Sequence, residues 1–174
     1  GAVYPNGSRF RRAGRTQGVF YASEHVETAV AEVAFQRLLF FAESPQTPFP
    51  DGATDFSAFT AKVRTERAID ISRPPFDTAD MMRLQDYSKC QALEETARKA
   101  GIEIIRYPSV RVPQKRANAA VLTPLAFASK RTFNWQTWRI RISAAGVSAL
   151  CDFPVMRLGF GADAFVADPR LADF

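Results

Sequence analysis

The sequence predicts an α+β domain in which mostly antiparallel strands accompany two main helices. Three observations lead to this expectation. The chain has 174 residues, enough for one domain with a real hydrophobic core. Its hydrophobic fraction is 47% and it contains 15 Phe, which favours a packed globule over a disordered chain. The expected strands and helices lack the regular β-α-β alternation of a parallel sheet, which favours mostly antiparallel pairing. From the length we expect one domain over residues 1–174.

The first half of the chain predicts a strand, a long helix and two further strands. The expected elements are a strand at Gly18–Ala22, a helix from Ser23 to about Phe41, and strands at Phe56–Arg64 and Arg67–Ile71. Ser23 is suited to cap the helix, because a serine hydroxyl accepts a free backbone N–H at a helix start. Two proline-bearing loops, Glu43–Thr54 and Ser72–Thr78, separate these elements.

The second half predicts one more helix, over Asp86–Ala100, followed by four strands. Asp86 is the expected N-cap and Gly101 the expected residue just past the helix end. The apolar stripe of this helix is Cys90, Leu93, Ala97 and Ala100. The strands are Ile102–Tyr107, Asn118–Leu122, Trp135–Ser143 and Val147–Cys151, and the tail from Phe153 is expected to be irregular. In Trp135–Ser143 apolar residues alternate with arginines, so one face of that strand should meet water.

The charge of the chain restricts the classes of site. The net charge is +5, with 18 Arg against 5 Lys. Arginine binds phosphates and carboxylates in a bidentate manner, so a phosphate-bearing partner is one interpretation of this excess. The other interpretation is that a high-GC genome supplies many arginine codons. A single histidine, His25, leaves no His/Cys cluster at ligand spacing. No G-x-S-x-G, P-loop or G-x-G-x-x-G motif is present.

The cysteines and the ends of the chain bear on localisation. Cys90 and Cys151 lie far apart in the sequence, and we expect both to be buried free thiols. Free thiols fit a reducing, cytoplasmic compartment. The opening residues Gly1–Pro5 lack the basic start and apolar run of a signal peptide, and no stretch has 18 consecutive apolar residues.

Glu32 is the most informative single residue. The segment Thr28–Ala42 is apolar nearly all round and contains one acid, Glu32. A helix that is apolar on every side is normally buried, and a buried carboxylate is costly unless it is paired. Candidate partners are the Arg-rich segment Gly7–Arg15, Tyr21 and the segment Arg106–Arg111. The plain alternative is a structural ion pair of Glu32 with Arg37 or Arg106.

Four short pieces of sequence follow one another along the chain. They are Gly7-Ser8-Arg9-Phe10, Val19–Glu24 followed by Thr28-Ala29-x-x-Glu32, Ile105-Arg106-Tyr107-Pro108-Ser109-Val110-Arg111, and Asn118-Ala119-Ala120-Val121. Together they resemble the RES family, named for an Arg, a Glu and a Ser. The resemblance spans about Asn6 to Phe153. It implies an ADP-ribosyltransferase-like fold and a toxin of a bacterial toxin–antitoxin pair that consumes NAD+.

The resemblance also implies a set of site residues. They are Arg9, Tyr21, Glu32, Ser109 and Asn118. Cleavage of the nicotinamide–ribose bond passes through a sugar cation, which an ionised Glu32 would stabilise while bonding a ribose hydroxyl. Arg9 would hold the pyrophosphate or the ribose, and Tyr21 would stack on nicotinamide. Ser109 and Asn118 would hydrogen-bond the ribose or the carboxamide. Water, phosphate or a protein side chain would accept the ADP-ribose, making the chain a glycohydrolase, a phosphorylase or an ADP-ribosyltransferase.

Partners follow from the same resemblance. We expect an Xre-like helix-turn-helix antitoxin whose tail covers the pocket, NAD+ as substrate, no metal and no membrane, and nucleic acid reached only through the antitoxin. Family members usually carry a further segment ahead of the Gly-Ser-Arg-Phe piece, with an Arg-Tyr pair that contributes to the cofactor pocket. No such pair precedes Gly7, so we expect that segment to be absent and the NAD+ pocket to be incomplete.

Each site residue also has a plainer interpretation. The run that contains Arg9 is typical of a solvated face, Tyr21 of a core strand, and Ser109 after Pro108 of a turn. Arg106 and Arg111 are secondary candidates, and Trp135 and Trp138 are assigned to packing. For the whole chain, the alternatives are an Arg-rich nucleic-acid-binding module and a RES-like protein that binds its partner without catalysis.

Overall fold

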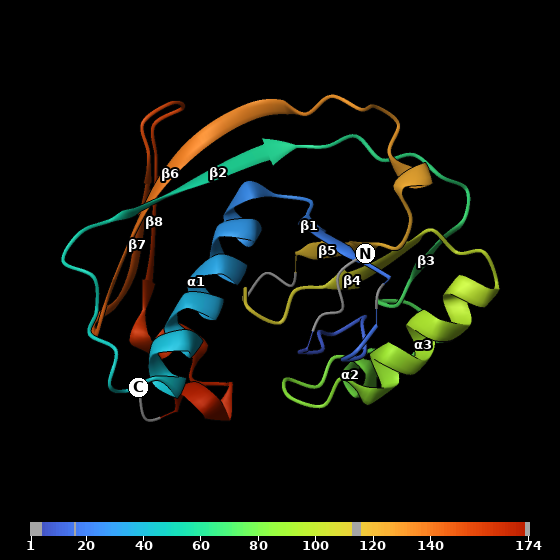
Figure 1. Ribbon diagram of the computed structural model, residues 1–174, viewed down its shortest axis with the longest axis horizontal. Helices are drawn as coiled ribbons and strands as arrows, with labels where there is room; N and C mark the ends of the chain where they lie inside the picture. Colours follow the sequence, from blue (N-terminus) through green and yellow to red (C-terminus); the bar gives the residue numbers. More distant parts are fainter. Residues whose placement is uncertain (1–4, 16, 113–115, 173–174) are drawn as a thin grey trace. The chain divides into compact units, whose positions relative to one another are not determined.

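The computed structural model describes residues 5–15, 17–112 and 116–172. The chain divides into two compact units, each made of two chain segments. Unit 1 comprises Gly1–His25 and Lys62–Lys130, and unit 2 comprises Val26–Ala61 and Arg131–Phe174. Each unit contains one four-stranded sheet, and among the described strands only the β3–β4 pair is parallel (Figure 1). The predicted α+β class with mostly antiparallel pairing is confirmed.

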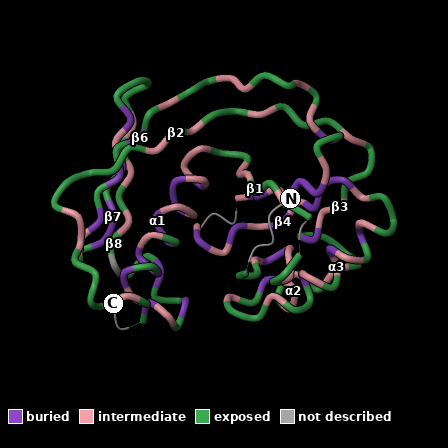
Figure 2. The backbone as a smooth tube through the Cα atoms, in the orientation of Figure 1, coloured by how far each residue is buried: buried purple, intermediate pink, exposed green. Residues whose placement is uncertain are grey.

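The sheet of unit 1 has the order β1-β5-β4-β3. Its strands are β1 Phe20–Ser23, β5 Ala117–Val121, β4 Ile104–Pro108 and β3 Ala68–Asp70. The two central strands are mostly buried, as their apolar sequences require, whereas the outer strands are more exposed (Figure 2). Asn118 of β5 lies opposite Ser23 on one side and opposite Tyr107 on the other. Asn118 therefore has a residue of β1 and a residue of β4 as its direct neighbours across the sheet.

The main helix of unit 1 is α3, Ser88–Lys99, preceded by the short helix α2, Thr78–Met81, which the sequence did not predict. Asp86 is not the N-cap: Tyr87 occupies that position, and the Asp86 carboxylate accepts the Ser88 N–H at 2.9 Å. The predicted role of Gly101 is confirmed. Its φ is 73°, a conformation that favours glycine. The N–H groups of Ala100, Gly101 and Ile102 all donate to carbonyls of its last turn, which closes the end of the helix.

The core of unit 1 places α3 and an N-terminal loop against the sheet. Its buried members are Phe10, Ile71, Met82, Cys90, Ala97, Ile105, Tyr107, Ala120 and Leu122. Ala100 is exposed and Leu93 half-buried, so the predicted apolar stripe narrows to Cys90 and Ala97. Phe10 is fully buried, with its ring centre 4.9 Å from that of Tyr107. Burying this ring anchors the loop to the sheet.

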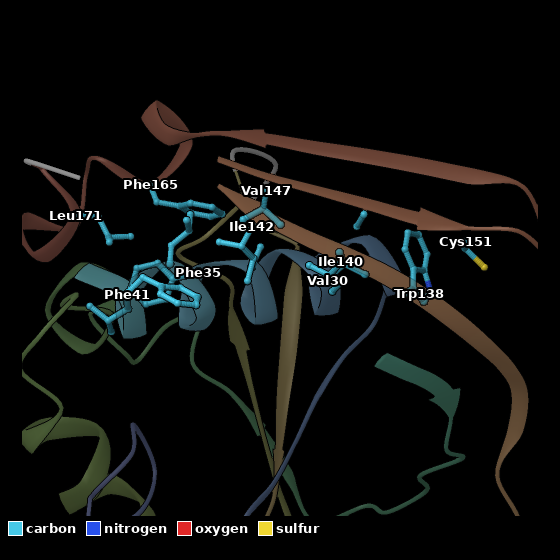
Figure 3. Close-up of a cluster of buried hydrophobic side chains, with 14 residues drawn as sticks. Val30, Phe35, Phe41, Trp138, Ile140, Ile142, Val147, Cys151, Phe165 and Leu171 are labelled. Atoms are coloured by element: carbon cyan, nitrogen blue, oxygen red, sulfur yellow. The ribbon is translucent and has the colours of Figure 1, made fainter. Parts of the chain in front are cut away.

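The sheet of unit 2 has the order β2-β6-β7-β8 and packs against α1, Val26–Glu43. Its strands are β2 Thr54–Thr60, β6 Phe133–Ser143, β7 Gly146–Cys151 and β8 Met156–Gly161. Figure 3 shows Val30 and Phe35 of the helix beside Ile140, Ile142 and Val147 of the sheet. The helix is therefore fixed by burial of apolar side chains on the sheet.

Two predictions about unit 2 were wrong. Ser23 does not cap α1: it ends β1, and its hydroxyl donates to Asn118 Oδ1 at 2.7 Å. The tail after Phe153 is not irregular, because it forms β8 and the 3-10 turns η2 Ala162–Phe165 and η3 Pro169–Leu171. In β8, half-buried apolar residues alternate with Arg157 and two glycines, a pattern that glycine makes hard to recognise.

The remaining sequence predictions fared as follows. β6 alternates buried apolar residues with exposed arginines, as expected. Trp138 is buried, and Trp135, although 62% exposed, packs on Phe59 with the ring centres 5.1 Å apart, so both tryptophans pack as predicted. Cys90 and Cys151 are buried free thiols, as predicted. None of the described helices combines the length and the hydropathy that crossing a membrane requires.

Candidate functional site

The loop that carries Arg9 is a tight turn, here called the Arg9 loop (residues 7–11). The N–H of Ser8 donates to the Arg11 carbonyl at 2.8 Å, and the N–H of Arg11 donates to the Ser8 carbonyl at 3.1 Å. A Cβ on Gly7 would lie 3.2 Å from the Arg11 carbonyl oxygen and 3.2 Å from the Ala13 nitrogen. Glycine therefore permits the close backbone approach that shapes the turn.

Arg9 is a buried cation without an acidic partner among the described residues. The residue is 9% exposed, Nη1 donates to the Arg83 carbonyl at 3.0 Å, and the guanidinium carbon lies 4.6 Å from the centre of the Tyr87 ring. Other arginines of unit 1 pair with carboxylates: Arg12, Arg67, Arg83, Arg98 and Arg106. A buried charge is costly without compensation, so an anion at Arg9 would be stabilised.

The thiol of Cys90 lies beside Arg9 and supplies no negative charge. Burial raises its pKa, although the charge and the hydrogen bond of Arg9 act in the opposite direction. Its Sγ donates to the Met81 carbonyl at 2.9 Å. At neutral pH the thiol is protonated, so it leaves the charge of Arg9 uncompensated.

The hydroxyl of Tyr21 holds the Arg9 loop. It accepts the Phe10 N–H at 2.9 Å and lies 2.9 Å from the Ser8 hydroxyl. Burial raises the Tyr21 pKa, although the hydrogen bonds and the charges of nearby arginines partly lower it. The phenol is therefore neutral at neutral pH. The residue as a whole is 38% exposed, so the interpretation of Tyr21 as a plain core residue does not hold.

Ser109 and Asn118 are both buried, at 2% and 3% exposure. Ser109 directly follows β4, where its Oγ accepts the Arg111 N–H at 3.1 Å and its own N–H donates to the Arg116 carbonyl at 2.7 Å. Asn118 accepts the Ser23 hydroxyl on the neighbouring strand. Ser109 does organise a turn, as its plainer interpretation holds, but it does so inside unit 1 and not at its surface.

The register of the sheet assigns these side chains to one face. Residues two apart on a strand share a face, and antiparallel partners lie on the same face. Tyr21, Asn118 and Tyr107 therefore share the face on which Phe10 packs. Phe10 is the neighbour of Arg9, so unit 1 gathers the Arg9 loop, Tyr21 and Asn118 on one side of its sheet.

Arg106, a secondary candidate, lies on the opposite face of the same sheet. Its Nε and Nη2 donate to the two Glu24 carboxylate oxygens at 2.7 and 3.1 Å, and Nη1 donates to Asp70 Oδ2 at 2.8 Å. The hydrogen bond from Arg106 lowers the Glu24 pKa. Burial acts to raise the Asp70 pKa, but hydrogen bonds from Ser72 and Arg106 outweigh it and the net shift is downward. Arg106 therefore joins β1, β3 and β4 as a structural cation.

Glu32 lies in unit 2, on α1, and is half-buried. The buried side chains of this helix are Thr28, Val30, Ala31, Ala34, Phe35, Leu38, Leu39 and Phe41. The helix is thus buried over much of its circumference, as its sequence predicts. Of the five residues singled out from the sequence, only Glu32 belongs to unit 2. The other four belong to unit 1: Arg9, Tyr21, Ser109 and Asn118.

Tyr87 and Gln91 contact the Arg9 loop but were not predicted from the sequence. Tyr87 lies under the Arg9 guanidinium, and the Gln91 amide donates to the Ser8 carbonyl at 3.0 Å and the Arg11 carbonyl at 3.4 Å. The sequence feature that could have identified them is their four-residue spacing, because residues spaced in this way at a helix lie on the same side of it. That signal is weak without knowledge of what α3 faces.

In a comparison with protein-family models, the RES domain matches residues 1–143. The match includes all five residues singled out from the sequence. Among curated proteins none matches the chain. A match over most of the chain, with an α+β fold of two antiparallel-rich sheets, fits the ADP-ribosyltransferase-like fold and a toxin-like, NAD-related role in general. The chain belongs to the RES domain family.

Proposed function

We propose that this chain is the toxin of a bacterial toxin–antitoxin pair and acts by breaking the nicotinamide–ribose bond of NAD+. The observation that carries the proposal is Arg9: a buried guanidinium with no carboxylate partner among the described residues, in a chain of the RES family. A dinucleotide supplies the missing anion through its pyrophosphate. Arginine is the side chain best matched to such oxygens.

The reaction needs little proton transfer. The bond between the ribose C1 and the nicotinamide nitrogen breaks, and nicotinamide leaves as a neutral molecule with the electron pair. The ribose becomes a sugar cation, as in glycoside hydrolysis. Water then gives ADP-ribose and a proton, whereas inorganic phosphate gives ADP-ribose 1″-phosphate. No metal is needed, because the departing ring is positively charged before the bond breaks.

Glu32 is the proposed catalytic carboxylate. A fixed negative charge that bonds a ribose hydroxyl stabilises the developing cation more than the substrate, which is the condition for catalysis. Its place on a helix held by apolar packing suits this role, because the packed helix restricts movement of the carboxylate.

The unit 1 residues are proposed to bind the dinucleotide. Arg9 holds the pyrophosphate or the adjoining ribose, and Ser109 and Asn118 hydrogen-bond the ribose or the carboxamide. The Tyr21 hydroxyl is engaged by the Arg9 loop, so the part of Tyr21 proposed to stack on nicotinamide is its ring.

The proposed partner is an Xre-like helix-turn-helix antitoxin, and the proposed place of action is the cytoplasm, where the NAD+ pool lies. An enzyme that consumes NAD+ must be restrained by such a partner in the cell that makes it. The contact with nucleic acid then belongs to the antitoxin.

Expression in bacteria without an antitoxin tests the proposal. Intracellular NAD+ is measured over time after induction of the wild-type chain, Glu32→Gln and Glu43→Gln. Glu43 is the matched control, because it is an exposed acid at the end of the same helix. We expect NAD+ to fall before growth stops for the wild type and Glu43→Gln, and to stay constant for Glu32→Gln. Growth arrest at constant NAD+, or equal depletion by Glu32→Gln, would refute the proposal.

A further inference from the structure

We propose that Tyr87, the N-cap residue of α3, and Gln91, in the first turn of that helix, are positioning residues that fix Arg9 for the anionic part of its ligand. This inference rests on the proposed function in one respect, namely that Arg9 binds the diphosphate of NAD+. It adds two residues to the site that the sequence motifs do not include.

Tyr87 supports the charged end of Arg9. The guanidinium carbon lies 4.6 Å from the centre of the Tyr87 ring, a distance at which a cation is attracted to an aromatic face. The Arg83 carbonyl accepts a hydrogen bond from Nη1 at 3.0 Å. The ring and the carbonyl together fix both the plane and the rotation of the guanidinium, while its charge keeps no carboxylate partner among the described residues.

Gln91 supports the backbone of the same loop. Its Nε2 donates to the Ser8 carbonyl at 3.0 Å and to the Arg11 carbonyl at 3.4 Å. These are the two carbonyls that close the turn around Arg9. Tyr87 and Gln91 are four residues apart, so one side of α3 holds both the backbone and the side chain of the loop.

The chemical consequence is preorganisation. An arginine on a loop normally loses side-chain freedom when it binds, which weakens affinity. A guanidinium already held over the Tyr87 ring has lost most of that freedom, and its remaining N–H groups lie in the plane of the guanidinium, where phosphate oxygens approach. Tyr87 and Gln91 do not touch the reacting atoms, so we expect their loss to raise KM and Kd with little change in kcat.

Calorimetric titration with NAD+ and, separately, with ADP tests the proposal. The variants are Tyr87→Phe, Tyr87→Leu, Gln91→Met, Arg9→Ala and the double variant Arg9→Ala/Tyr87→Leu. Gln91→Met keeps the length of the side chain and removes its donors. The controls are Phe127→Leu, an aromatic residue of unit 1 that packs on Phe20, and Gln17→Met, an exposed glutamine. Circular dichroism and thermal unfolding confirm that each variant is folded.

Both ligands are expected to bind about 10-fold more weakly to Tyr87→Leu and Gln91→Met, the size of a cation–π or a hydrogen-bond loss. Tyr87→Phe should bind both ligands within about 2-fold of the wild type, because it keeps the aromatic ring face. The two controls should do the same, because they leave Tyr87 and Gln91 unchanged. In the Arg9→Ala background Tyr87→Leu should have no further effect. If Tyr87→Leu does not fold, Gln91→Met decides the test.

Three results would overturn the inference: unchanged affinity in Tyr87→Leu and Gln91→Met, an equal loss with and without Arg9, or no Arg9-dependent binding of either ligand. The proposed function fails separately. If NAD+ binds in an Arg9-dependent way but no nicotinamide is released, the enzyme proposal is wrong while the positioning role stands.

Discussion

At the scale of single residues, Arg9 is distinguished by its surroundings and not by its sequence. Arg9, Arg11, Arg12 and Arg15 form one basic run, and the run alone is typical of a solvated face. The fold buries Arg9 and pairs Arg12 and Arg15 with Glu95. Phe10 explains the difference, because its burial against the sheet draws Arg9 inward. The solvated interpretation is therefore wrong for Arg9.

Tyr21 combines two roles that substitutions can separate. Tyr21→Phe keeps the ring and leaves the Phe10 N–H without its acceptor, so we expect the free energy of unfolding to fall by about 1–2 kcal/mol. Tyr21→Leu also removes the ring, and we expect it to slow nicotinamide release further at saturating NAD+. Urea unfolding and initial rates measure the two effects. Equal rates for the Phe and Leu variants would show that the ring does not act on nicotinamide.

At the scale of elements, the sequence predicted most strands to within about two residues, because short runs of apolar or alternating residues are bounded by turn residues. It failed where tertiary contacts decide. Ser23 resembles a helix cap, yet a strand partner takes its hydroxyl. Asp86 resembles an N-cap and its carboxylate accepts the Ser88 N–H, yet the helix begins one residue later, with Tyr87 at the N-cap position. Such side chains can satisfy several backbone groups, and local sequence does not choose among them.

The Arg106 network gives a pH prediction at this scale, since it joins three strands. The Glu24 pKa is lowered in the folded state, so its contribution to stability is present above the unfolded pKa of about 4.3 and is lost as pH falls through the folded value. The Glu24 side chain is 46% exposed, so the contribution is small and screened by salt.

We therefore expect Glu24→Gln to lower stability less at pH 3 than at pH 6, and to have a larger effect at low salt. Urea unfolding at the two pH values measures this. Glu66→Gln is the control, an exposed acid of the same unit. A Glu24→Gln effect that is as large at pH 3 as at pH 6 would contradict an ionic role for the network.

At the scale of the whole molecule, the family match ends at residue 143 but the fold does not. β7 and the two 3-10 turns supply Val147, Phe165 and Leu171 to the core around α1 (Figure 3), and the apolar residues of β8 pack against that core. Residues 144–174 are therefore part of the unit that carries Glu32.

The arginine excess also has a structural account at this scale. At least nine of the arginines form ion pairs: Arg12, Arg15, Arg67, Arg73, Arg83, Arg98, Arg106, Arg139 and Arg170. Charges paired within the chain contribute less to a nonspecific phosphate-binding surface. This weakens the nucleic-acid-binding alternative without reference to the family. The other alternative, a RES-like protein that binds its partner without catalysis, can be distinguished from the proposed enzyme only by an assay of catalysis.

The most direct test of the account is the rate of nicotinamide release by the purified chain incubated with NAD+. Wild type, Glu32→Gln and Glu43→Gln are compared by chromatography, with and without phosphate, after each is confirmed to be folded. We expect release by the wild type and Glu43→Gln, and a rate lower by about 100-fold or more in Glu32→Gln. No release by the folded wild type, or an undiminished rate in Glu32→Gln, would contradict the claim that this chain cleaves NAD+ through Glu32.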